Sequence, residues 1–156
     1  MSKMDNLVIQ LVKNRNELPW ELLLFADPSR DSIKKYIDSS EIYVAKINGK
    51  IVGEYALLTR SKSKVELMNI AVDEKQQGKG IGEQLVFDAI IKAKNKGANK
   101  IEVGTGNSSL APLALYKKCG FKIIGIDKGF FSRNYKEEII ENGIKCVDMI
   151  RLAIDF

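Results

Sequence analysis

The apolar residues of this chain fall into short runs and alternating patterns that have the length of β-strands. Such runs, bounded by turn residues, predict strands. The predicted strands cover residues 7–13, 64–72, 100–106, 121–127 and 144–154. Within residues 41–59 two further strand-like runs flank Asn48 and Gly49, and an Asn-Gly pair in that position predicts a tight hairpin turn.

Two segments near the start of the chain repeat their apolar residues at helical spacing. Residues 17–26 predict a first helix, with Pro19 tolerated in its first turn. Residues 30–38 predict a second short helix that Ser29 can cap.

The two later helices have clearer ends. One begins near Gly80 and stops before Gly97, where a glycine commonly ends a helix. The other begins near Ser108 or Ser109, which are candidate caps, and ends at Gly120. The apolar face of the first of these two helices consists of Ile81, Leu85, Val86, Ala89, Ile90 and Ala93.

The resulting order is a strand, two helices, a hairpin, an alternation of strands and helices, and a final strand. This order predicts an α/β or α+β domain with a mixed sheet. The sequence has no internal repeat and no linker, so we expect one domain over residues 1–156. A polar and aromatic segment follows the strand predicted over 121–127 and runs into the start of the last one; it is here called the insert (residues 129–148), and the pattern does not assign its shape.

Composition limits the classes of protein that fit. Hydrophobic residues make up 45% and charged residues 29% of the chain, as in ordinary soluble globular proteins. No apolar run approaches the length of a membrane span, and the N-terminus shows no secretory signal, so we expect a cytoplasmic protein without a membrane partner. Cys119 and Cys146 are expected to be buried thiols rather than a disulfide framework.

Histidine is absent from the chain. This excludes a histidine-based triad and, with only two cysteines, argues against a zinc site or other metal centre. Acid–base chemistry must then use carboxylates, tyrosine, lysine, cysteine, water or the backbone. The net charge of +5 favours anionic ligands weakly, but the lysines are scattered without aromatic neighbours, so we expect no nucleic-acid partner.

The segment QQGKGIGEQL, residues 76–85, places three glycines at the mouth of a predicted helix. The first amides of a helix lack intrahelical partners and favour anions such as phosphate. Gly78, Gly80 and Gly82 carry no side chain that would keep an anion away from those amides. The same glycines can also serve only to shape the turn. The segment matches neither the P-loop pattern nor the dinucleotide pattern, since Glu83 stands where the latter needs its last glycine.

The spacing Gln77-x-x-Gly80-x-Gly82 resembles the acetyl-CoA loop of the GNAT family of N-acetyltransferases, [QR]-x-x-G-x-[GA]. The surrounding LMNIAVDEKQQGKGIGEQLVFDAI resembles the strand–loop–helix core of that family, and NSSLAPLALYKKCGF resembles its next motif. The resemblance implies the acyl-CoA N-acyltransferase fold, with a mostly antiparallel sheet flanked by helices. It also implies acetyl transfer from acetyl-CoA to a primary amine without a covalent enzyme intermediate, and it is compatible with a homodimer.

The family's binding residues carry over by position. The resemblance implies that the backbone of the key strand holds the pantetheine arm of CoA and that an amide there stabilises the oxyanion; the residues concerned are Asn69, Ile70, Ala71 and Val72. It implies that the loop amides bind the pyrophosphate; these belong to Gln77, Gly78, Lys79, Gly80, Ile81 and Gly82, with Glu83 at the edge. Asn107 is expected to bind the pantetheine arm, and Tyr116 to donate a proton to the departing sulfur.

The general base and the acceptor are less determined. Glu66 is the first candidate for the base, Glu54 the second and Glu102 the third, and a chain of water molecules is an alternative to all three. Any of these carboxylates can instead be an ordinary strand residue. A CoA-binding module without catalysis is the alternative function.

Polyamines, aminoglycosides, amino acids, peptide N-termini and protein lysines all remain candidate acceptors. The insert is the expected contributor to the acceptor pocket, through Phe130, Phe131 and Tyr135. Its acidic residues either form a solvated helix face or attract a cationic amine; they are Glu137, Glu138 and Glu141.

Overall fold

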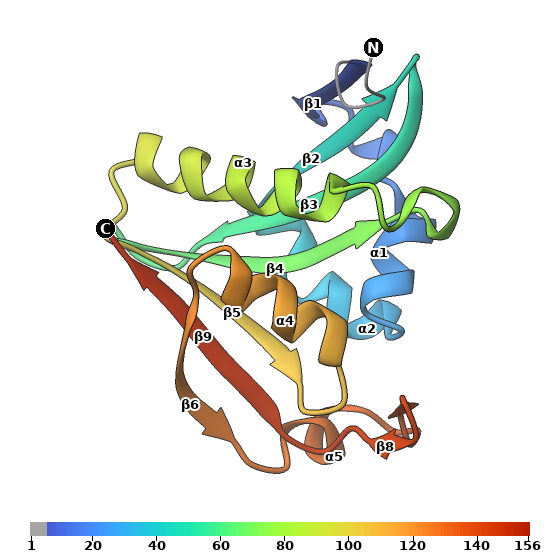
Figure 1. The fold of residues 1–156 in the computed structure, drawn as a ribbon, viewed down its shortest axis with the longest axis vertical. Helices are drawn as coiled ribbons and strands as arrows, with labels where there is room; N and C mark the ends of the chain where they lie inside the picture. Colours follow the sequence, from blue (N-terminus) through green and yellow to red (C-terminus); the bar gives the residue numbers. More distant parts are fainter. Residues whose placement is uncertain (1–5) are drawn as a thin grey trace.

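The structure, a computed structural model, describes residues 6–156, which form a seven-stranded sheet covered by helices on both faces (Figure 1). The strand order is β1-β2-β3-β4-β5-β9-β6, and within it only β4 and β5 are parallel neighbours. The strands are β1 (Leu7–Leu11), β2 (Ser40–Ile47), β3 (Lys50–Thr59), β4 (Lys64–Val72), β5 (Lys100–Gly106), β6 (Lys122–Asp127) and β9 (Met149–Asp155). The predicted mixed, mostly antiparallel sheet is therefore confirmed.

The helices divide between the two faces of the sheet. The α-helices are α1 (Trp20–Ala26), α2 (Arg30–Lys34), α3 (Ile81–Asn95), α4 (Leu110–Lys118) and α5 (Phe130–Asn134). Short 3-10 turns are η2 (Arg15–Glu17), η3 (Ile37–Ser39) and η4 (Glu74–Gln76), and the insert ends in a small hairpin, β7 (Ile140–Glu141) and β8 (Ile144–Lys145).

Each face of the sheet has its own apolar core. The larger core lies under α3 and α4, and the predicted apolar face of α3 is confirmed because all six of its residues are buried there. The smaller core lies under α1 and α2 and centres on Leu23, Ile33 and Ile42.

Most element boundaries agree with the sequence, and the exceptions have physical causes. The Asn48-Gly49 hairpin is confirmed, with φ of 51° and 78° at its two central residues. Ser29 caps α2 as predicted, since its hydroxyl accepts from the Ser32 amide at 3.1 Å. The helix predicted from residue 17 begins instead at Trp20, because Pro19 occupies the N-cap rather than the first turn.

Two further expectations are corrected. The predicted helix over 30–38 is α2 followed by a separate 3-10 turn, Ile37–Ser39. The predicted last strand over 144–154 is broken into β8 and β9. The amides of Val147 and Asp148, which lie between these strands, donate to the Asn107 side chain at 2.8 and 3.0 Å and leave the sheet ladder.

Buried ion pairs hold β4, β5 and β9 together on the face covered by α1 and α2. Arg151 donates to Glu66 at 3.0 Å and to Glu102 at 2.9 Å. Arg60 also pairs with Glu66 at 2.9 Å, and Lys64 with Glu102 at 3.5 Å. Burial raises the pKa of Glu102, but Arg151 and Lys64 outweigh it, so the net effect is a lowered pKa.

Within residues 6–156 no helix is both long and apolar enough to cross a membrane. The same residues contain no group of three or more metal-ligating side chains.

We expect Arg151→Met to lower the free energy of unfolding by about 2–3 kcal/mol, because it leaves two nearly buried carboxylates with one cation each. Urea unfolding at pH 7 measures this loss. The Glu102 part of this stabilisation is present above the usual carboxyl pKa of 4.5 and is lost as the pH falls through the lowered folded pKa. The difference in free energy of unfolding between Arg151→Met and wild type should therefore shrink in acid.

The control is Lys100→Met, which removes an exposed pair with Asp155 at 3.7 Å. This substitution should cost about 0.5 kcal/mol or less. Equal losses in the two variants would contradict a structural role for the Arg151 network.

Candidate functional site

The parallel strands β4 and β5 pair only over their first halves. Their register runs from Lys64 opposite Lys100 to Leu67 opposite Val103. Beyond this point β4 stays paired with β3, and β5 stays paired with β9. The facing edges of β4 and β5 therefore diverge without hydrogen bonds, as Figure 1 shows.

A β-bulge lies where the two strands part. Ala56 of β3 is opposite Asn69, whereas Leu57 is opposite Leu67, so Met68 is the extra residue of β4. A bulge bends its strand and increases the local twist. The bulge at Met68 thus directs the second half of β4 away from β5.

The unpaired edge of β4 presents backbone amides. The Asp73 amide donates to the Val52 carbonyl of β3 at 2.8 Å. Because successive amides of a strand point to opposite edges, the amides of Ile70 and Val72 face the open side. The Gln77 side chain donates to the Val72 carbonyl at 3.1 Å, which ties the following loop to this edge.

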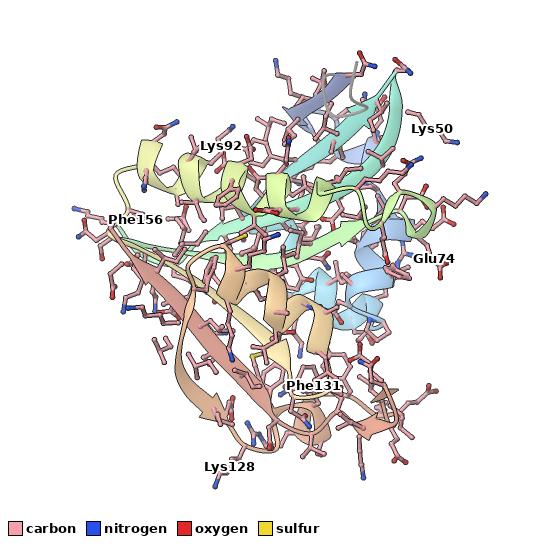
Figure 2. All side chains as sticks on the ribbon, in the orientation of Figure 1. Lys50, Glu74, Lys92, Lys128, Phe131 and Phe156 are labelled. Carbon is pink, nitrogen blue, oxygen red and sulfur yellow. The ribbon has the colours of Figure 1, made fainter. Side chains whose placement is uncertain are left out.

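The loop after β4 places a helix end beside the parted strands. Gly78 and Gly80 have φ of 78° and 82°, a left-handed conformation that favours glycine. Gly80 is the N-cap of α3 and supplies no side-chain cap. The first α3 bond joins the Gln84 amide to the Gly80 carbonyl at 3.2 Å, so the amides of residues 81–83 have no partner within the helix. Figure 2 labels Glu74 on this loop, which projects past the end of β4.

The remaining loop residues have distinct surroundings. Gly82 lies inside α3, where a Cβ would come within 3.3 Å of Leu115 on α4, so its missing side chain lets the two helices approach. The Ile81 side chain is buried in the core, which leaves only its backbone for a ligand. Lys79 donates to the Gln76 side chain at 2.9 Å, and Glu83 pairs with Lys118 at 3.1 Å.

Tyr116 on α4 is buried, and its ring packs against Phe121 at 5.8 Å between centroids. Burial, followed by the charges of Glu54 and Cys119, raises the pKa of Tyr116 well above its usual value. Among the described residues its hydroxyl forms no hydrogen bond. The side chain therefore remains protonated and has a donor to offer.

Asn107 binds the insert through both ends of its amide. Its oxygen accepts from the Val147 and Asp148 amides, and its nitrogen donates to the Lys145 carbonyl at 3.1 Å. One N–H of the Asn107 side chain remains unused by these three bonds, so the pantetheine contact expected of Asn107 stays a prediction.

The predicted serine cap of α4 is also corrected. Ser109 occupies the N-cap but makes no capping bond, and the hydroxyls of Ser108 and Ser109 donate to Glu141 of the insert at 3.1 and 3.0 Å. The carboxylate thus draws both hydroxyls away from the helix end. Glu141 itself lies in β7 rather than on a helix face.

The three candidate bases differ sharply in their surroundings. Glu66 and Glu102 are held in the ion pairs with Arg151. Glu54 on β3 is fully buried, and neither of its oxygens has a hydrogen-bond partner. Burial therefore raises its pKa well above the usual 4.5. Of the three, Glu54 has the environment that enzymes use to make a carboxylate a stronger base.

Glu54 lies on β3 opposite Ala71, beyond the bulge of β4, and alternation along the strand puts its side chain on the same face as Ala56, under α1 and α2. Its charge raises the pKa of Tyr36, in the core under α1 and α2, and that of Tyr116, in the core under α3 and α4. Both residues lie within electrostatic reach of this carboxyl, which is therefore positioned to act where the strands part.

A polar cluster that the sequence did not predict lies on the α1–α2 face. The Asn69 amide donates to the Leu23 carbonyl and to the Tyr36 hydroxyl, each at 3.1 Å, and its oxygen has no partner. Tyr36 in turn donates to Asp27 at 3.3 Å, and Tyr135 of the insert donates to the same carboxylate at 2.8 Å. The dipeptide Asp27-Pro28 signals only a turn, so no local pattern could have indicated this cluster.

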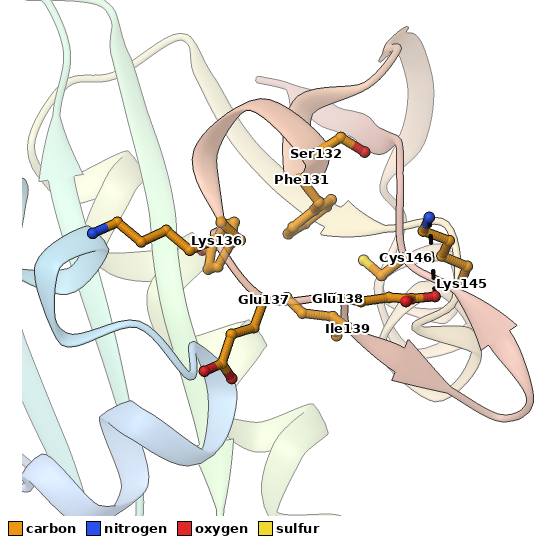
Figure 3. Close-up of a pocket in the computed structure, with 9 residues that line it drawn as sticks. Phe131, Ser132, Lys136, Glu137, Glu138, Ile139, Lys145 and Cys146 are labelled. Atoms are coloured by element: carbon orange, nitrogen blue, oxygen red, sulfur yellow. Dashed lines mark ion pairs between the residues drawn. The ribbon is translucent and has the colours of Figure 1, made fainter.

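The insert contacts this cluster through Tyr135. Its residues line a pocket of about 200 Å³, which includes Phe131, Tyr135 and Cys146 (Figure 3). Tyr135 lines the pocket and also bonds Asp27, so the pocket adjoins the α1–α2 segment. The parted strands thus have free amides at a helix mouth on one face and an enclosed polar cluster on the other.

Comparison with known proteins agrees with this geometry. Residues 10–121 match the family model described as the acetyltransferase (GNAT) family. An uncharacterized N-acetyltransferase of Bacillus subtilis, YvbK, is 51% identical over 97% of this chain and 98% of its own.

Two solved structures extend the comparison. A GNAT family acetyltransferase from Elizabethkingia anophelis with acetyl-CoA bound is 49% identical, covers 97% of this chain and 99% of its own, and superposes with a TM-score of 0.94. A Bacillus subtilis acetyltransferase in complex with CoA is 52% identical, covers 96% and 99%, and has a TM-score of 0.90. The chain therefore belongs to the GNAT family and is an N-acetyltransferase.

Proposed function

We propose that this protein transfers the acetyl group of acetyl-CoA to a primary amine, with the donor bound where β4 and β5 part. The observation that carries the proposal is the position of the α3 helix mouth directly after the unpaired edge of β4. The relatives from Elizabethkingia anophelis and Bacillus subtilis, bound to acetyl-CoA and CoA respectively, support the same ligand here.

The residues present fit a CoA thioester. The unpartnered amides of residues 81–83 suit a pyrophosphate, because a helix N-terminus favours negative charge. The amides of Ile70 and Val72 suit a pantetheine arm that runs along the open strand edge, where a peptide-like group can replace the missing strand.

When bound, acetyl-CoA supplies an acetyl group whose carbonyl carbon the neutral amine attacks while the carbon–sulfur bond breaks. An amide on the open edge of β4 can stabilise the negative charge on the carbonyl oxygen. Tyr116, still protonated, can donate its hydrogen bond to the sulfur and supply the proton of the free thiol. Glu54, with its raised pKa, takes the proton that the nitrogen loses, directly or through water.

Gly78 allows a test of the anion site with matched variants. A Cβ there meets nothing within 4 Å, and Asn and Asp adopt its positive φ more readily than other residues. We expect Gly78→Asp to bind acetyl-CoA about 3–10-fold more weakly than Gly78→Asn, because only the carboxylate repels phosphates.

Isothermal titration calorimetry at low and at high salt measures this difference. The gap between the two variants should narrow at high salt, because screening weakens the repulsion. The same dissociation constant for acetyl-CoA in both variants at low salt would contradict the proposal that this loop binds the phosphates.

Tyr116→Phe should lower kcat by about 100-fold, because the sulfur loses its donor. The dissociation constant for acetyl-CoA should change little. Release of CoA thiol measures turnover, and calorimetry measures binding. Tyr43→Phe is the control: Tyr43 is a buried tyrosine stacked on Tyr55 at 4.8 Å, so turnover should stay the same. Unchanged turnover in Tyr116→Phe would exclude the proton-donor role.

Glu54→Gln should reduce kcat by about 100-fold and also remove a pH dependence of stability. Above its usual pKa of 4.5 the unfolded chain loses this proton first, so wild-type stability falls as the pH rises toward the higher folded pKa. The fall contributed by this group is at most about 1.4 kcal/mol per pH unit.

Urea unfolding of both proteins between pH 4.5 and 8 checks the stability effect. The free energy of unfolding of Glu54→Gln, measured relative to that of wild type, should rise from pH 4.5 to pH 8. A constant difference, together with full activity, would show that Glu54 is neither a strained group nor the base.

A further inference from the structure

Asp27, at the end of α1, is a half-buried carboxylate without a cation. Its three hydrogen-bond partners are the hydroxyls of Tyr135 and Tyr36 and the amide of Ser29, at 2.8, 3.3 and 3.3 Å. All three donors are neutral. Within residues 6–156 no lysine or arginine forms an ion pair with this carboxylate, and burial raises its pKa despite the three bonds.

Two other carboxylates on this face do have cations. Glu66 pairs with Arg60 and Arg151, and Glu102 pairs with Lys64 and Arg151. The chain as a whole carries a net charge of +5, so positive side chains are in excess. The missing cation at Asp27 is therefore a local property, and carboxylates withdrawn from water generally require one.

A second observation lies next to Asp27. Both oxygens of the fully buried Glu54 and the oxygen of the buried Asn69 lack any partner. Tyr36 connects these groups to Asp27, since it accepts from Asn69, donates to Asp27 and senses the charge of Glu54. Buried oxygens without partners, linked through Tyr36 to a carboxylate without a cation, indicate a ligand that brings N–H donors and positive charge.

The distance from Asp27 to the parted strands is short. The Tyr36 hydroxyl lies 3.1 Å from the Asn69 side-chain nitrogen and 3.3 Å from an Asp27 oxygen. These two side chains are therefore at most about 6.4 Å apart at the atoms that Tyr36 joins. Asn69 follows the bulge residue Met68 directly. Tyr135 of the insert covers part of Asp27, which is itself partly buried, and this suits a small molecule better than a protein surface.

We propose that Asp27 binds a second ammonium group of the acceptor, so that the preferred acceptors are short diamines. One amine, neutral, attacks the thioester near Asn69. The other, still protonated, pairs with Asp27, whose carboxylate Tyr36 and Tyr135 orient. This inference rests on the proposed function and adds to it the class of acceptor.

The test compares 1,4-diaminobutane with n-butylamine, which has the same carbon chain and one amine fewer. With the full chain and saturating acetyl-CoA, the release of CoA thiol gives KM and kcat for each amine. We expect KM to be at least about 10-fold lower for the diamine, with similar kcat, because only the diamine can pair with Asp27.

Asp27→Asn should raise KM for the diamine about 10-fold and leave KM for butylamine unchanged. Asp31→Asn, at an exposed position of α2, is the matched control and should change neither value. Tyr135→Phe keeps the negative charge of Asp27 but removes one hydroxyl that orients its carboxylate, so it should raise KM for the diamine by only about threefold. Thermal unfolding of each variant verifies that it is folded.

The outcomes separate the two proposals. Equal KM for the two amines in wild type, or equal effects of Asp27→Asn on both, overturns the diamine inference and leaves acetyl transfer intact. If neither amine is acetylated although calorimetry shows acetyl-CoA bound, both the inference and the proposed small-amine chemistry are overturned. If Asp27→Asn does not fold, the response to Tyr135→Phe decides, and an unchanged KM for the diamine overturns the inference.

Discussion

The single extra residue in β4 is the constraint on which the site depends. Met68 bends the strand where pairing with β5 stops, and the backbone beyond it has amides without strand partners. In an otherwise continuous sheet such an edge would be costly unless a ligand or water satisfied it. The same break joins the two faces, so a donor on the α3–α4 side and an acceptor on the α1–α2 side can meet in the plane of the sheet.

The buried and partly buried carboxylates of the domain fall into two groups, those paired with cations and those without a cation. Below the break, Glu66 and Glu102 are neutralised by arginine and lysine and fasten three strands together. Above it, Glu54 and Asp27 are withdrawn from water without a cation. Carboxylates on one face thus have opposite electrostatic surroundings, and the difference lies in their neighbours.

This dependence on neighbours explains what the sequence could and could not predict. The Asn48-Gly49 hairpin, the apolar face of α3 and the glycine loop are local, and each was predicted from residues adjacent in the chain. The partner of Glu66, Arg151, lies 85 residues away, and that of Asp27, Tyr135, lies 108 residues away. Only the fold brings these pairs together, so the ranking of candidate bases and the polar cluster had no signal in the sequence.

Asn107 contacts only main-chain groups of the insert, namely two N–H groups and one carbonyl. These bonds do not depend on the side chains of the residues that Asn107 holds. Substitutions other than proline at Lys145, Val147 and Asp148 should therefore leave this anchor in place. The anchor fixes the path of the chain into β9, whereas the contacts of Tyr135 and Glu141 with the rest of the domain depend on the identity of their side chains.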